Sequence, residues 1–156
     1  EHSGHMIAEG GYKSVPETVH DGYLIAGDAA NLCMNLGYQV RGLDFACASG
    51  RFAAEAACSA IEAQDVSKAG LESYKAAMEN SFVMQDLRTF QKWPEVMEGW
   101  QSMFTDYPKM VAEVLDCLFV VDGRPQQHLA KRVMPVLKRR GLFKLAKEMK
   151  KGVDAL

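Results

Sequence analysis

Apolar residues near the start of the chain come in short groups separated by turn-forming residues. The stretch 6–19 is broken by glycine and proline, which predicts a short strand followed by a turn. Asp21 and Gly22 form a turn signal, and the continuous apolar run 23–26 then predicts a strand buried on both faces, as in a parallel sheet. Residues 31–42 are mixed in character and predict a loop with room for one helical turn.

The rest of the chain has the periodicity of helices. The strongest helix extends from Asp44 to about residue 64, where Asp44 is placed to cap the first turn and alanine dominates. Further helices are predicted over 71–80, over 82–106 with a break before Pro94, from Pro108 in a first turn to 121, over 126–139 and over 142–154. The predicted fold is an α+β fragment, mostly helical, whose few strands belong to a sheet completed by strands upstream.

Composition narrows the class of protein. Hydrophobic residues make up 48% and charged residues 24%, which predicts a packed globular chain, and the net charge of −2 argues against nucleic-acid binding. The four cysteines form no C-x-x-C pair, so we expect small buried thiols in a reducing cytoplasm and no metal site. No apolar run approaches the roughly 18–20 residues that span a bilayer.

One stretch of the sequence indicates a ligand-binding site. The run 23–26 delivers Asp28 to the end of a predicted strand, and Gly27 lets a ligand or another backbone come close. A carboxylate there is suited to accept hydrogen bonds from the hydroxyls of a sugar alcohol. Gly42 then opens the long helix, whose first N–H groups carry partial positive charge. A plain strand-to-helix turn with a capping aspartate explains the same residues and stays open as the alternative.

The longer pattern resembles a known cofactor motif. The run 27–30, Gly-Asp-Ala-Ala, a loop of about a dozen residues and then the run 42–46 resemble the second FAD-binding motif of glutathione-reductase-type flavoproteins. Within these flavoproteins, the motif resembles that of the branch containing aromatic hydroxylases, geranylgeranyl reductases and FixC-like proteins. It implies that Asp28 binds the ribityl chain and that the helix start lies against the flavin pyrimidine edge. The implied cofactor-binding residues are Gly27, Asp28, Ala29, Arg41, Gly42, Leu43 and Asp44.

Further segments are similar to FixC-like proteins of the electron-transfer-flavoprotein:quinone oxidoreductase family, namely 5–12, 36–46, 107–108 and 121–125. The resemblance is specific over residues 5–60 and loose beyond about residue 65. It implies that 1–64 is the C-terminal part of an FAD-binding domain and that 65–156 is a helical C-terminal region. The missing G-x-G-x-x-G fingerprint predicts a fragment that is inactive by itself.

The implied function is FAD-dependent electron transfer from an electron-transfer flavoprotein toward quinone or a ferredoxin-like protein. Outer-sphere electron transfer needs no catalytic acid or base, so no catalytic residue is predicted. A geranylgeranyl-reductase-like or hydroxylase-like flavoprotein is the alternative within enzymes. A helical interaction module without enzymatic activity is the alternative outside them.

Several side chains allow two interpretations. His5 and Glu9 line the substrate side of the flavin or are simply solvated. The aromatic residues of 82–106 favour core over a quinone channel. The basic stretch 131–151 ends in an amphipathic helix, which either packs its apolar stripe on the domain or contacts an acidic partner or the inner face of the membrane. The apolar stripe consists of Leu142, Leu145, Ala146, Met149 and Val153.

Overall fold

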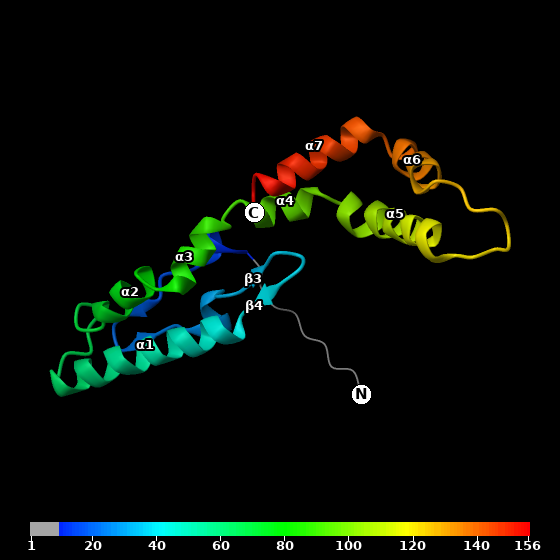
Figure 1. Ribbon diagram of the computed structural model, residues 1–156. Helices are drawn as coiled ribbons and strands as arrows, with labels where there is room; N and C mark the ends of the chain where they lie inside the picture. The colour runs from blue at the N-terminus through cyan, green and yellow to red at the C-terminus, as the bar shows by residue number, and fades with distance from the viewer. Residues whose placement is uncertain (1–9) are drawn as a thin grey trace. The chain divides into compact units, whose positions relative to one another are not determined.

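The computed structural model describes residues 10–156, which fall into two compact units (Figure 1). The first runs to Pro94 and the second spans Glu95–Ala155. Both are dominated by helices, and the few strands are short, so the prediction of a mostly helical α+β chain is confirmed. The candidates His5 and Glu9, and the start of the first predicted strand, lie outside the described residues.

The first strands among residues 10–156 form a small hairpin. After the 3-10 helix η1 (Tyr12–Ser14), β1 (Val19–His20) pairs antiparallel with β2 (Tyr23–Leu24). Gly22 has a φ of 80°, which lets the chain reverse in two residues and makes antiparallel neighbours of the strands it joins. The prediction of a strand buried on both faces in a parallel sheet is wrong for the described residues, because Tyr23 is 55% exposed.

The segment predicted as a loop holds more regular structure than expected. After the 3-10 helix η2 (Gly27–Ala30), which precedes this segment, residues 31–42 contain a second antiparallel hairpin, formed by β3 (Met34–Asn35) and β4 (Val40–Arg41). Strands of two residues leave no alternation in the sequence that could have revealed them. This hairpin delivers the chain directly to the start of the long helix.

The first unit is built around helix α1 (Leu43–Glu62), which was predicted with almost these bounds. Its buried positions lie on one face and consist of Phe45, Ser49, Ala56 and Ala60. Helices α2 (Glu72–Glu79) and α3 (Phe82–Thr89) pack against α1, as Figure 1 shows. Small side chains on α1 let its neighbours come close without leaving voids.

The second unit contains the remaining helices, after α4 (Trp93–Gly99) has crossed the boundary between the units. They are α5 (Ser102–Phe119), α6 (Leu129–Arg139) and α7 (Leu142–Val153). The prediction that Pro108 lies in a first turn is wrong, because α5 begins earlier and Pro108 lies inside it. Proline there removes one N–H from the helix, and an exposed helix can give the freed carbonyl to water.

The aromatic residues of 82–106 do not form one core. Trp93 is only 2% exposed, whereas Phe82 is 44% and Phe104 is 61% exposed. The core interpretation is therefore correct for Trp93 and wrong for the two phenylalanines. Among the helices that the structure describes, none combines the length and apolar character needed to cross a membrane.

Candidate functional site

Gly27 fixes the position of η2 on helix α1. Its φ of 60° lies in the left-handed region, and a Cβ on Gly27 would come within 3.3 Å of the Cβ of Ala46. Its buried N–H donates to Oγ of Ser49 at 3.0 Å, and the Ser49 hydroxyl donates to the carbonyl of Ala46. Glycine is required here both for its conformation and for the close approach of the helix.

Asp28 follows on the exposed side of η2. Its Oδ1 lies 4.0 Å from the position that a Cβ on Gly42 would occupy, which places the carboxylate beside the start of α1. No hydrogen bond or ion pair joins this carboxylate to another of residues 10–156. The carboxylate is therefore available to accept hydrogen bonds from a ligand. Ala29, next to it, is also exposed.

Helix α1 begins without a side-chain cap. Gly42 is the N-cap residue, with extended φ of −158° and no capping hydrogen bond. A Cβ at Gly42 would make ordinary contacts, with Cys33 Sγ at 3.7 Å and with the Leu32 carbonyl and Asp28 Oδ1 at 4.0 Å, so the protein itself does not exclude a side chain at this position. Uncapped N–H groups and the helix dipole favour negative charge at this point. The first residue of the helix, Leu43, is 82% exposed.

Arg41 and Asp44 form an ion pair at the side of this helix tip. Nε of Arg41 donates to Oδ2 of Asp44 at 2.8 Å, and its Nη1 donates to Oδ2 of Asp86 at 2.5 Å. The guanidinium also lies 4.6 Å from the centre of the Phe45 ring. Burial acts to lower the pKa of Arg41, but the hydrogen bonds to the two aspartates outweigh it and raise that pKa. Arg41 thus ties β4 and α1 to α3.

The prediction that Asp44 caps the long helix is wrong. Asp44 lies in the first turn and turns its carboxylate to Arg41, while Gly42 takes the N-cap position. The physical consequence is favourable for a ligand. An aspartate at the N-cap would occupy the first N–H groups of the helix, whereas an aspartate beside it leaves them open.

The structure brings Gly27, Asp28 and Gly42 together, and it places Ala29 and Leu43 in exposed positions near them. The sequence analysis missed Ser49, whose hydroxyl accepts the hydrogen bond from the N–H of Gly27. No feature of the sequence indicated this role beyond a hydroxyl in an alanine-rich helix. The sequence analysis also missed Asn31, which takes a left-handed conformation and donates to the Ser14 carbonyl at 2.8 Å.

The arrangement fits a ligand with a hydroxylated chain joined to a ring. An unpaired carboxylate can accept from hydroxyls, and an uncapped helix start a few ångströms away can stabilise negative charge on a ring edge. Because Gly42 has no side chain, a ligand can approach the helix start closely. These are the requirements of the ribityl chain and the pyrimidine edge of FAD, so the residues present fit this cofactor.

The cysteines differ in how far they are exposed. Cys47 and Cys58 are exposed on α1, contrary to the expectation of buried thiols, while Cys33 is buried. Among the described residues, no group of three or more His, Cys, Asp or Glu side chains is arranged to hold a metal ion.

A second surface of interest lies on α7. The face of this helix that contacts its own unit includes Leu145, Glu148 and the buried Gly152, while Met149 is 54% and Val153 is 70% exposed. Four of the five predicted stripe residues, Leu142, Ala146, Met149 and Val153, are exposed and are called the α7 stripe below, whereas the fifth, Leu145, is half-buried, so the predicted stripe packs only in part within the described residues. Among these residues Lys147, Lys150 and Lys151 form no ion pair.

Comparisons with known proteins agree with the resemblance. Residues 93–156 match the family model described as "ETF-QO/FixC family C-terminal domain", which begins close to the division between the two units. The "Probable electron transfer flavoprotein-quinone oxidoreductase YdiS" of Escherichia coli (strain K12) is 44% identical over 156 residues, covering 100% of the chain. "Protein FixC" of the same organism is 39% identical over the same 156 residues.

A more distant relative gives the same result. "Protein FixC" of Azorhizobium caulinodans is 34% identical over 136 residues, or 86% of the chain and 31% of that protein. The chain spans 36% of the length of the two Escherichia coli relatives. The whole chain thus corresponds to a C-terminal portion of the proteins it matches.

Proposed function

We propose, from the premise that this chain belongs to the ETF-QO/FixC family, that its first unit supplies part of the FAD site of an electron-transfer oxidoreductase. The observation that carries the proposal is the unpaired Asp28 carboxylate beside the uncapped start of α1 at Gly42. Asp28 accepts hydrogen bonds from the hydroxyls of the ribityl chain. Gly42 leaves room for the ring, and Gly27 and Ser49 hold η2 in place.

FAD, when bound, supplies the redox chemistry by taking up and releasing electrons. The chain contributes position and charge. The N–H groups at the start of α1 stabilise negative charge at the pyrimidine edge, which favours the reduced cofactor. Leu43 covers an apolar part of the ring, while Arg41 holds the helix start in place through Asp44 and Asp86.

The proposed direction of electron flow is from an electron-transfer flavoprotein toward quinone or a ferredoxin-like protein. The names of the relatives support the first two partners, since YdiS is described as a probable electron transfer flavoprotein-quinone oxidoreductase. Electron transfer between cofactors requires no proton donor, which agrees with a site made of one carboxylate, glycines and a helix end.

Gly42→Ala tests the cofactor site with little risk to folding. The new Cβ would meet its nearest neighbours at 3.7 and 4.0 Å, which are ordinary contacts, so only a ligand close to the helix start would be disturbed. In the full-length protein we expect FAD affinity, measured by titration of flavin absorbance, to fall about tenfold or more, as for loss of a well-placed contact. Asp28→Ala should weaken FAD binding to a similar extent.

Gly99→Ala in α4 is the matched control, because a Cβ there has nothing within 4 Å. It should leave flavin binding unchanged. If Gly42→Ala and Asp28→Ala both retain FAD like the control, the flavin does not lie at this helix tip and the proposal fails.

We further propose that the second unit contacts an anionic membrane surface, where quinone dissolves. The α7 stripe is exposed, Phe143 beside it is 85% exposed, and the lysines at 147, 150 and 151 lie on the same helix. An amphipathic helix with an apolar face and flanking lysines binds anionic lipid by burial and charge together.

Vesicle binding tests the membrane contact. A variant with Lys147, Lys150 and Lys151 changed to Gln should lose most binding to vesicles containing anionic lipid, and salt should have the same effect on the unaltered protein. Arg139 and Arg140 are less suitable targets, because they pair with Glu113 and Asp106 and their loss would disturb the unit itself. Binding that ignores both salt and the triple substitution would contradict the proposal.

A further inference from the structure

Three charged side chains, Arg41, Asp44 and Asp86, meet beside the start of α1. Nε and Nη2 of Arg41 donate to Oδ2 of Asp44 at 2.8 and 2.5 Å, and Nη1 donates to Oδ2 of Asp86 at 2.5 Å. Two carboxylates therefore share one guanidinium. With one positive and two negative groups, the cluster keeps one negative charge in excess.

The guanidinium of Arg41 is held at its faces as well as at its edge. Its central carbon lies 4.6 Å from the centre of the Phe45 ring and 5.6 Å from that of Phe82. Phe82 lies one helical turn before Asp86, so the ring and the carboxylate project from the same side of α3. Groups of both α1 and α3 thus restrain the side chain of Arg41.

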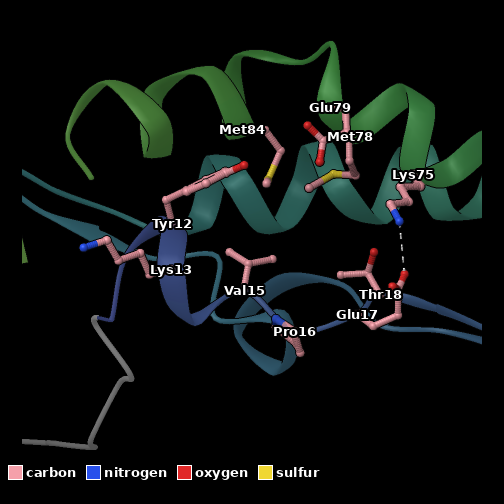
Figure 2. Close-up of a pocket in the computed structure, with 10 residues that line it drawn as sticks. All are labelled: Tyr12, Lys13, Val15, Pro16, Glu17, Thr18, Lys75, Met78, Glu79 and Met84. Carbon is pink, nitrogen blue, oxygen red and sulfur yellow. Dashed lines mark ion pairs between the residues drawn. The ribbon is translucent and has the colours of Figure 1, made fainter. Parts of the chain in front are cut away.

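Helix α3 presents Asp86 from a firmly packed element. On another face of the helix Val83, Met84 and Leu87 are buried, with 0%, 6% and 1% of their surface exposed. In Figure 2, which shows the cavity that Met84 lines, this side chain extends from α3 toward Val15. Anchoring of this kind keeps a supporting residue in place, so Asp86 is suited to fix Arg41.

The cluster opposes the charge preference of the helix start. Gly42, the N-cap of α1, follows Arg41 directly in the chain, and its uncapped helix start favours negative charge. An excess negative charge beside it disfavours further negative charge, with an energy that falls with distance and with screening by water. The side chains of Arg41 and Asp86 are only 24% and 31% exposed, so this screening is partial. The charge of the cluster therefore influences how strongly negative charge is held at the helix start.

We propose that Asp86 is a positioning residue that lowers the reduction potential of the flavin through Arg41. By sharing the guanidinium, Asp86 leaves an excess negative charge beside the helix start. The site then holds the reduced cofactor less tightly than a neutral pair of Arg41 and Asp44 would, and electrons pass more readily to the acceptor. The inference rests on the proposed FAD site and adds to it a residue that adjusts its potential.

Asp86→Asn removes the charge and keeps the shape of the side chain. The amide oxygen can still accept from Arg41, so the position of the guanidinium should be preserved. In the full-length protein, the affinity for reduced FAD relative to oxidised FAD should rise on the order of fivefold. Because a tenfold change corresponds to about 30 mV for a two-electron couple, the midpoint potential should rise by about 20 mV. Equilibration with a redox dye of known potential measures the change, and the affinity for oxidised FAD should stay close to that of the unaltered protein.

Arg41→Gln separates a charge effect from a structural one. It leaves two carboxylates without a cation, so the midpoint potential should fall, opposite to the effect of Asp86→Asn. If these residues only held the helix start in place, either substitution would loosen it and weaken the stabilisation of negative charge by the N–H groups. Both variants would then have a lower potential than the unaltered protein. A higher potential in Arg41→Gln would contradict the proposed sign.

Glu55→Gln is the matched control, because Glu55 also pairs with an arginine on the same helix. Its Oε1 lies 3.0 Å from Nη1 of Arg51. Glu55 is eleven residues beyond Asp44, which is about 16 Å along the helix axis. That separation exceeds the Debye length of about 8–10 Å at ordinary ionic strength, so the control should leave the midpoint potential unchanged.

An unchanged or lower midpoint potential in Asp86→Asn would overturn the inference. An equal shift in Glu55→Gln would also overturn it, because the effect would then come from net charge alone. If Gly42→Ala and Asp28→Ala lose FAD affinity and Asp86→Asn does not shift the potential, only the role of Asp86 is wrong. If those two variants retain FAD like Gly99→Ala, the flavin does not lie at the helix tip and both proposals fail.

Discussion

Helices α1 and α5 have similar lengths but differ in how far they are buried in their own units. Helix α1 buries four residues, Phe45, Ser49, Ala56 and Ala60, whereas α5 has no buried residue. On α5 large apolar side chains face outward, with Val111 51% and Phe119 75% exposed. The first unit is thus organised by close packing on a helix of small residues, and the second keeps much of its apolar surface free.

Both units use hydrogen bonds and ion pairs between elements to satisfy polar groups. In the first, buried groups bond across elements, as when Gly27 donates to Ser49 and the Tyr74 hydroxyl donates to the Ile25 carbonyl at 2.9 Å. In the second, ion pairs near the surface join the helices, and Arg140 lies 2.7 Å from Asp106. Rigid placement of groups suits a cofactor site and exposed apolar area suits a docking surface, which agrees with the roles proposed for the first and the second unit.

The largest expected effect separates the two kinds of packing. Phe45→Ala should lower the unfolding free energy of the first unit by about 3–5 kcal/mol, because it removes a ring that is fully buried and leaves a cavity. The same change at Phe104 of α5 should lower the unfolding free energy of the second unit by no more than about 0.5 kcal/mol, because that ring is 61% exposed.

Each unit has its own tryptophan, Trp93 or Trp100, so urea unfolding can be followed separately. A Trp100→Phe background makes fluorescence report on the first unit, and Trp93→Phe makes it report on the second. Equal losses for Phe45→Ala and Phe104→Ala would show that α5 is covered in solution and that the contrast between the helices is wrong.

The next effect concerns alkaline pH and the first unit alone. Burial raises the pKa of Tyr74 from 10.0 to about 12. The folded state thus favours the neutral phenol, so stability is full below pH 10 and is lost as the pH rises toward 12. The loss should reach roughly 2–3 kcal/mol, since each pKa unit corresponds to about 1.4 kcal/mol.

Tyr74→Phe isolates this effect. The variant loses the hydrogen bond to the Ile25 carbonyl at neutral pH, at a cost of about 1 kcal/mol. Its unfolding free energy should lack the decrease between pH 10 and 12 that ionisation of Tyr74 causes in the unaltered protein. Urea titrations at several pH values measure the difference from the unaltered protein. Parallel pH profiles for the two proteins would refute the assignment.

The sequence predicted the helices well where periodicity was long. Helices α1, α2 and α7 begin and end within a few residues of their predicted bounds, because each has a sustained apolar face or a clear terminating residue. The hairpins were not predicted, since strands of two residues have no period. Pro108 was predicted in a first turn because proline is usually unfavourable inside a helix, but α5 contains it in its interior.

The candidate site was predicted through its motif more than through its geometry. Asp28 and Gly42 are far apart in the chain, and only the motif resemblance suggested that they meet, as they do in the structure. Asp44 was mistaken for a cap because its carboxylate pairs with Arg41, and Arg41 is itself held by a tertiary contact, the ion pair with Asp86 of α3. Ser49 could not be found, since its role depends on the position of Gly27.

The smallest expected effect concerns acid pH and the second unit. Oε2 of Glu148 accepts from Tyr107, from Ser102 at 3.0 Å and from Trp100 at 3.3 Å. The Tyr107 hydrogen bond, more than the others, holds the pKa of Glu148 below its usual 4.5, although burial opposes it. The folded state thus favours the carboxylate, so this stability is present above pH 4.5 and is lost as the pH falls through the lower folded pKa.

Glu148→Gln should lower the melting temperature of the second unit at neutral pH and leave it nearly unchanged at a pH where Glu148 is protonated. The effect should be about 1 kcal/mol or less, because a quarter of the side chain is exposed and water screens the charge. Trp100 fluorescence reports it directly, since the indole N–H bonds this carboxylate. The melting temperature of the first unit should not depend on Glu148. A matching change in Trp93 fluorescence would mean that the two units unfold together. In that case the contrast between the units would not extend to their stability.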